Sequence, residues 1–215
     1  MIANPTAAEL VVRILFLFGY AALFAAVEIE IEGPHGWAER LPTWYRVTPW
    51  YARLYARVMN GKPLTGYHAV MFVLPLMSFH MGFVGGVPWS WPAEAATLSA
   101  YLVWAAVWDL LWFVFNPRYG WGRFMPSEVW WHRRWVGRLP VDYVGAIVVS
   151  TLVAASAGIV SGDLGALVNH GALLAGLVGL ALLASLAAPA YMRHHTYMRR
   201  AGADERSLCI PTQKG

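Results

Sequence analysis

Cysteine and charged residues are both scarce in this chain of 215 residues. Cys209 is the only cysteine, which excludes a disulfide framework and a site built from several thiolates within one chain. Asp, Glu, Lys and Arg make up 13% of the residues, against roughly 25% in an average soluble domain. Hydrophobic residues make up 58%. The chain therefore has too little polar surface for a soluble protein and is expected to lie in a membrane.

Long apolar runs account for the shortage of charge. Five of them are near or above the ~20 residues that a helix needs to cross a bilayer core: residues 11–27, 66–87, 95–115, 143–162 and 164–192. Backbone groups in lipid must be bonded within the segment, so each run is expected to be a helix. The first run is the weakest, because Arg13 interrupts its start. The sequence predicts an all-α integral membrane protein, with one transmembrane domain (1–192) and a basic tail (193–215).

The basic residues indicate the orientation of these helices. Of 16 Lys and Arg, only Arg13 lies outside three groups of five, which follow the first, third and fifth runs. Basic loops stay cytoplasmic, so we expect the N-terminus outside and the C-terminus inside a prokaryotic cytoplasmic membrane. The pI near 9.4 then reflects topology and not nucleic-acid binding. The N-terminus has no basic region and no small-residue cleavage site, so no removable signal peptide is predicted, and Cys209 is expected to stay reduced.

Two connecting segments combine aromatic residues with arginine. Residues 44–59 place Tyr51, Leu54, Tyr55 and Val58 at helical spacing, and residues 124–135 have Pro126 where a helix would start. Both are predicted to be amphipathic helices at the cytoplasmic interface. They either anchor the protein through aromatic side chains or form walls of a site for an amphiphilic or anionic substrate.

Asp109 is a carboxylate inside an otherwise apolar run. It precedes Asn116 by seven residues, so it lies about 10 Å from the inner end of a helix that rises 1.5 Å per residue. An ionised group at that depth needs a partner. The alternatives are a metal ion, an arginine of the next connection (Arg118, Arg123, Arg133 or Arg134), a proton or ion path, or a protonated acid bonded to a neighbouring helix.

Several carboxylates and histidines are predicted at the same inner level of the membrane. They are Glu28, Glu30, His68, Asp109, Glu128 and His132, with His194 and His195 nearby. Mixed carboxylate and imidazole ligands suit Fe, Zn or Mn. We therefore predict a metal site whose ligands are Glu30, His68, Asp109 and His132. Glu128, expected on the same helix face as His132, is a further ligand or a general acid/base, and Asp109 is the second candidate catalytic residue.

The acids at the end of the first run differ in direction. Glu28 and Glu32 are four residues apart and share a helix face, whereas Glu30 points away from them. The alternative to metal binding is a solvated helix end whose acids pair with arginines. Neither an HExxH motif nor the histidine boxes of membrane desaturases occur in the chain.

Two further histidines are predicted in the outer half of the membrane. His80 and His170 lie at similar depth on the second and fifth runs, as the two axial ligands of a b-type haem would. The alternative is that each is a hydrogen-bonded packing residue.

Four motifs carry a resemblance to a known family: EIEIEGPHGWAERLPTW, GKPLTGYH, FNPRYGWGRF and WWHRRW. Together they resemble a family of small, functionally uncharacterised prokaryotic integral membrane proteins, over residues 28–143. The resemblance implies that these motifs belong together. It brings no activity, cofactor or catalytic residue.

These patterns favour a membrane-embedded enzyme with a carboxylate/histidine metal site at the cytoplasmic face, acting on a lipid-like or membrane-soluble substrate. The first three runs are predicted to carry function and the last two, rich in small residues, to be scaffold. One alternative is a non-enzymatic membrane subunit whose polar cluster is a structural ion-pair network. Others are a haem b protein and a small transporter, although no internal repeat supports the latter. Expected partners are membrane lipids, a lipid-like molecule, and a second copy or a larger membrane complex.

Overall fold

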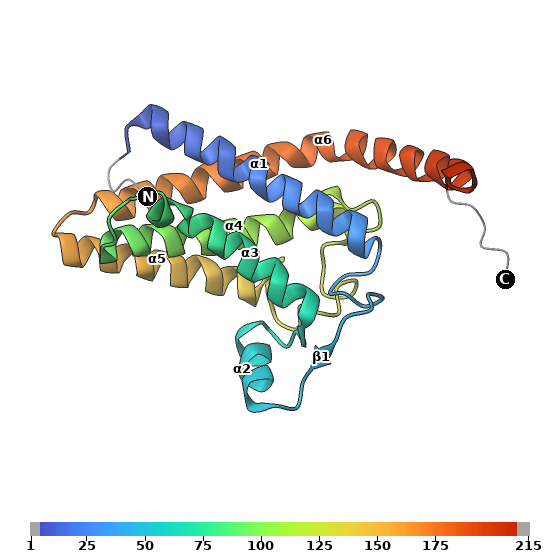
Figure 1. Ribbon diagram of the computed structural model, residues 1–215, viewed down its shortest axis with the longest axis horizontal. Coiled ribbons are helices and arrows are strands. Elements are labelled where there is room, and N and C mark those ends of the chain that lie inside the picture. Colours follow the sequence, from blue (N-terminus) through green and yellow to red (C-terminus); the bar gives the residue numbers. More distant parts are fainter. Residues whose placement is uncertain (1–4, 210–215) are drawn as a thin grey trace.

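Five long helices form the body of the protein (Figure 1). The computed structural model describes residues 5–209, with side chains as far as residue 202. The long helices are α1 (Ala7–Glu32), α3 (Gly66–Val84), α4 (Trp91–Phe115), α5 (Val141–Ser161) and α6 (Gly165–Cys209). Among the described residues, these five are long and apolar enough to cross a membrane. The predicted all-α fold and its number of candidate spans are therefore confirmed.

The central helix of the bundle is α4. In its most apolar stretch 56% of the residues are buried, against 17–22% in the other four long helices. It packs against α1, α3, α5 and α6. Its Trp104, Trp108 and Trp112 are all at most 3% exposed, because they pack against aromatic residues of α1, α3 and the connection after α4. Helix α4 therefore forms the core on which the other four long helices pack.

Asn116 joins the ends of α1 and α4. Its Nδ2 donates to the carbonyl of Gly33, which follows α1, at 2.8 Å, and its Oδ1 accepts from the backbone N–H of Arg118 at 2.9 Å. Gly33 has φ +62°, a conformation in which glycine ends helices without strain. The two helix ends are therefore held together at the end of the bundle where the polar residues gather.

The connection between α1 and α3 contains a short helix within residues 44–59, where the first amphipathic helix was predicted. Helix α2 (Trp50–Val58) lies outside the bundle of long helices (Figure 1). Strands β1 (Tyr45–Arg46) and β2 (Leu64–Thr65) pair antiparallel on either side of it. The return of the chain to β2 brings the start of α3 back to the end of α1.

The second predicted amphipathic helix, over residues 124–135, is wrong. The connection between α4 and α5 instead holds a short 3-10 helix (Trp121–Arg123), turns, and a hairpin of β3 (Trp135–Val136) and β4 (Leu139–Pro140). Within residues 124–135 the buried residues are Phe124, Val129, Trp131 and His132. Their spacing does not follow one helical face, so packing onto the bundle overrides the local pattern.

Helix α6 is longer than the predicted last span. It continues through Cys209 and extends beyond the other long helices (Figure 1). The first part of the predicted tail is thus helical. Nε2 of His195 lies 2.6 Å from Oε1 of Glu30, a contact that ties this extension to α1. Lys214 and the side chains of Arg206 and Cys209 lie outside the described part of the chain.

Candidate metal centre

Glu28, Glu32 and His68 form a buried cluster between α1 and α3. The potential ligand atoms of the three side chains all lie within 4.8 Å of one another. Nε2 of His68 is 3.8 Å from Oε1 of Glu28 and 3.7 Å from Oε1 of Glu32. These distances are too long for hydrogen bonds. They are close to the spacing of ligands around one ion, since two atoms about 2.1 Å from zinc at the tetrahedral angle lie about 3.4 Å apart.

The ring of His68 is oriented by two neighbours. Thr65, the N-cap of α3, accepts from the backbone N–H of His68, and its Oγ1 lies 2.8 Å from Nδ1 of the ring. The indole of Trp37 stacks on the imidazole, with ring centroids 3.7 Å apart and planes within 12°. When Nδ1 donates to Thr65, the lone pair of Nε2 faces both carboxylates. Metal-binding histidines commonly use such an outer hydrogen bond.

The loop after α1 folds back onto Glu32. Trp37 and Ala38 adopt left-handed backbone conformations, with φ of 56° and 54°, which cost a non-glycine residue of order 1–3 kcal/mol each. The backbone N–H of Ala38 donates to Oε1 of Glu32 at 2.5 Å, and the Tyr45 hydroxyl donates to the carbonyl of Ala38. The Glu32 carboxylate thus stabilises the strained turn through its hydrogen bond with Ala38. This turn places the indole of Trp37 over the ring of His68.

A second cluster lies between the start of α5 and the inner part of α4. Nζ of Lys62 is 2.6 Å from Asp142, and Nδ1 of His132 is 3.1 Å from the same carboxylate. Nε2 of His132 lies 3.3 Å from Oδ2 of Asp109, at ion-pair distance but outside hydrogen-bond direction. The Tyr143 hydroxyl donates to that oxygen at 2.5 Å. A carboxylate therefore faces each ring nitrogen of His132.

The two clusters differ in charge balance. Asp142 lies 2.6 Å from the ammonium group of Lys62, and His132 lies between Asp142 and Asp109. Glu28 and Glu32, each only 6% exposed, face no permanently charged cation within 4 Å among the described residues. Burying an unpaired carboxylate is strongly unfavourable. The charge of the first cluster is therefore to be balanced by a bound cation or by protonation of the cluster's own groups.

A cavity of about 300 Å³ adjoins both clusters. Its polar side is formed by Glu28, Lys62, His68, Asp109 and Asp142, and its apolar walls include Trp37, Tyr55, Phe72, Tyr101, Leu102 and Ala146. Four α4 residues in its wall, Tyr101, Leu102, Ala105 and Ala106, are partly exposed, so the cavity opens on the flank of the bundle. Apolar walls with a few convergent polar groups are typical of small-molecule sites.

Tyr55 brings a free polar group to this cavity from α2. Its hydroxyl is buried and has no hydrogen-bond partner among the described residues. Burial, with smaller contributions from Tyr101 and the nearby aspartates, raises the pKa of Tyr55. The phenol therefore stays neutral and can donate a hydrogen bond to a molecule in the cavity.

The predicted metal ligands do not form one group. His68 joins Glu28 and Glu32, whereas Asp109 and His132 contact each other in the second cluster. Glu30 points away from both, as the spacing predicted, with its side chain 59% exposed and bound to His195. The placement of Glu30 among these ligands is therefore wrong, because it lies on the other face of α1.

Glu128 lies apart from the cavity. It is exposed, while His132 is buried, so the predicted alignment of the two on one helix face is wrong. The reason is that residues 124–135 form turns. The solvated interpretation of Glu32 is also wrong, since this side chain is buried. The predicted arginine partner for Asp109 is likewise replaced by His132 and Tyr143.

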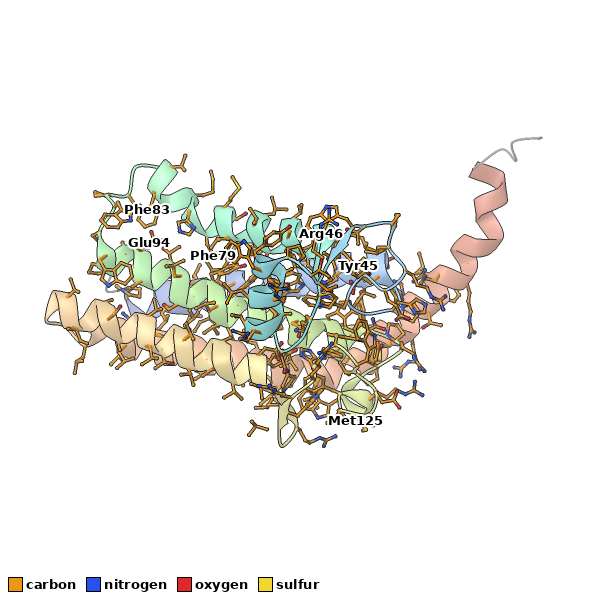
Figure 2. The ribbon with its side chains drawn as sticks, turned by 90° about the horizontal axis from the view of Figure 1, so that it is seen from below. Tyr45, Arg46, Phe79, Phe83, Glu94 and Met125 are labelled. Atoms are coloured by element: carbon orange, nitrogen blue, oxygen red, sulfur yellow. The ribbon has the colours of Figure 1, made fainter. Side chains whose placement is uncertain are left out.

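His80 and His170 lie in different helix pairs. The ring nitrogens of His80 contact the Leu76 carbonyl at 2.7 Å and Glu94 at 3.0 Å, between α3 and α4. Figure 2 shows Glu94 near Phe83, toward the opposite end of the bundle from Tyr45 and Arg46. His170 lies between α6 and α5, 3.3 Å from Thr151 Oγ1. No described contact joins the two histidines, and each has the hydrogen-bonded surroundings of a packing residue.

Sequence reasoning missed Lys62, Asp142 and Tyr143 as residues of the site. Lys62 stands in the GKPLTGYH motif six residues before His68, and Asp142 stands at the inner end of the fourth run. Both therefore lie at the predicted level of the site, a signal that could have included them. The last two spans were predicted to be scaffold, but α5 brings Asp142 and Tyr143 to the second cluster.

Comparisons of the chain with protein-family models, curated proteins and solved structures find no match. The functional argument therefore depends on the geometry of the site.

Proposed function

We propose that the protein is an integral membrane metalloenzyme that acts on a lipid-like or membrane-soluble substrate. In this proposal Glu28, Glu32 and His68 bind one divalent cation, and the adjoining cavity holds the substrate. The observation that carries the proposal is the buried pair of carboxylates that shares an imidazole but has no cation of its own. Five apolar helices long enough to span a membrane support its location.

The donor set suits Zn, Mn or Fe, because it mixes carboxylate oxygen with imidazole nitrogen. Three protein ligands leave positions for water or substrate, as in catalytic sites. The ion would activate water or, if redox-active, oxygen. On the opposite wall, Asp109 can accept a proton from a molecule in the cavity, because His132 and Tyr143 orient its carboxylate. The Tyr55 hydroxyl can position a polar group of the same molecule.

Metal content tests the proposal directly. The protein, purified in detergent and stripped with a chelator, is reloaded with Zn²⁺, Mn²⁺ or anaerobic Fe²⁺ and measured by elemental analysis. We expect about one ion per chain in the wild type and a loss of that ion in Glu32→Gln and His68→Ala. Glu30→Gln is the matched control, because it removes the same group from the other face of α1 and should keep the ion. A wild type without metal, or ligand variants that retain it, would falsify the proposal.

A structural ion-pair network is the second candidate function. It is favoured by the buried contact of Lys62 with Asp142, which joins the connection before α3 to the start of α5, 80 residues along the chain. In that case Glu28 and Glu32 are protonated, a chelator leaves the melting temperature unchanged, and Glu28→Gln is neutral or stabilising. The metalloenzyme proposal expects the chelator to lower the melting temperature and Glu28→Gln to abolish that effect.

A further inference from the structure

Four arginines surround a second cavity, outside the metal centre. This cavity has a volume of about 330 Å³ and is lined by Arg53, Arg57, Asn60, Gly61, Arg133 and Arg134, with no acidic residue in its wall. We call it the arginine groove. Arg53 and Arg57 come from α2, and Arg133 and Arg134 precede β3. All four arginine side chains are exposed.

The four guanidinium groups have no acidic partner within the described residues. Every described salt bridge involves lysine or histidine as the cation. Arg53 donates instead to the carbonyl of Thr48 at 2.8 Å. Like charges gathered around one groove repel each other, so an anion placed between them stabilises the arrangement.

The groove is held in shape by Asn60 and by the packing of the Arg133 stem against Gly61. Asn60 is 7% exposed and adopts a left-handed conformation, with φ 55°. Its Nδ2 donates to the carbonyl of Arg134 at 2.9 Å, and its Oδ1 accepts from the N–H of Arg134 at 3.0 Å. The stem of Arg133 crosses Gly61 so closely that a Cβ there would lie 2.3 Å from Cδ of the arginine. Two segments 74 residues apart are thus fixed side by side before any ligand binds.

The surroundings of the groove indicate where its anion comes from. Helix α2 exposes Trp50, Tyr51, Leu54 and Val58, which are 45–71% accessible. Such residues are typical of helices that lie in the headgroup layer of a membrane, where arginines of the same helix meet anionic lipids. Guanidinium groups bind phosphate through paired hydrogen bonds.

We propose that the arginine groove binds the phosphate of an anionic phospholipid in the leaflet next to α2. The proposal is independent of the metal centre, since none of the groove residues belongs to that cluster. It adds a lipid-binding site that fixes how deeply α2 lies against the membrane, and α2 also carries Tyr55 to the wall of the substrate cavity.

The test compares lipids and arginines in pairs. The full-length protein in mild detergent is titrated with short-chain phosphatidylglycerol, short-chain phosphatidylcholine and glycerol 3-phosphate, and binding is followed by native mass spectrometry. We expect saturable binding of phosphatidylglycerol at least tenfold tighter than binding of the other two. The double variant Arg57→Gln/Arg134→Gln should weaken it tenfold or more.

The control variant Arg46→Gln/Arg138→Gln removes the same charge from exposed positions that do not line the groove. It should weaken phosphatidylglycerol binding by less than threefold. Equal weakening by both double variants would overturn the site, because it would indicate general attraction to a basic surface. Glycerol 3-phosphate binding as tight as the lipid would overturn the lipid source and assign the groove to a soluble phosphate. Retention of metal by the groove variant is measured alongside, so that loss of lipid binding can be separated from failure of the metal proposal.

Discussion

Lys62 is the cation on which the second cluster depends. Its ammonium group is 3% exposed and lies 2.6 Å from Asp142, which also faces His132. Lys62→Met should destabilise the protein by about 3–5 kcal/mol, because it leaves one buried partner of an ion pair without the other. Adding Asp142→Asn should recover part of this loss. Equilibrium unfolding in detergent measures both values, and additive effects of the two substitutions would contradict a direct pair.

Asp109 is expected to affect stability and activity but not metal content. It is bonded to Tyr143 and paired with His132, and it does not belong to the Glu28 cluster. Asp109→Asn should lower the melting temperature, since hydrogen bonds to a charged group contribute about 1.5–3 kcal/mol, and should abolish turnover. Tyr143→Phe is the matched change on the other partner. Loss of the bound ion in Asp109→Asn, measured by elemental analysis, would place Asp109 among the ligands.

The spacing of the acids in EIEIE correctly separates Glu28 and Glu32 from Glu30. What the sequence does not contain is the rotation of α1 within the bundle, which decides that Glu28 and Glu32, and not Glu30, face His68. His68 is recognisable because Thr65 caps the helix on which it stands. For His132 the sequence predicts only its level in the membrane. Its position beside Asp109 depends on the turns between α4 and α5, which form as this connection packs against the bundle.

Among the elements, the two long connections support each other. Gly36, after α1, approaches Trp131, after α4, so closely that a Cβ would lie 2.1 Å from the indole ring. Trp131 is 3% exposed and stacks on Phe113, so it has little room to move. Gly36→Ala should therefore destabilise by about 1–3 kcal/mol. Gly145→Ala, on α5 with nothing within 4 Å, should be neutral or slightly stabilising, and thermal unfolding compares the two.

The long apolar segments are the part of the fold that could be predicted from the sequence. A segment long enough to cross the bilayer must bond its own backbone groups, and it does so as a helix. The two long connections could not be predicted, since their aromatic residues can either stay exposed on a helix or pack into the core. In α2 Trp50 and Leu54 stay exposed on a helix, whereas Phe124 and Trp131 are drawn into the core and the backbone follows them. Two segments of similar composition were therefore both predicted to be helical, and only the first of them forms a helix.

At the scale of the whole molecule, the basic segments gather at one end. The connection after α1, the connection after α4 and the extension of α6 all lie toward the same end of the bundle (Figure 1). This arrangement supports the prediction of a cytoplasmic C-terminus. Alkaline phosphatase fused after Gly215 should be inactive in cells, and the same reporter placed in the connection between α3 and α4 should be active. The reverse pattern would contradict the orientation.

The partly exposed α4 residues in the cavity wall give the proposed function a kinetic consequence. A substrate that entered through this flank would never leave the bilayer, so turnover should depend on its mole fraction among the lipids and not on its concentration in the bulk solution. Adding inert lipid or detergent at constant total substrate should then slow turnover by surface dilution, while adding buffer should not. On this basis Tyr101 and Leu102 sit at the entrance, and Leu102→Trp should lower the rate without changing the amount of bound metal.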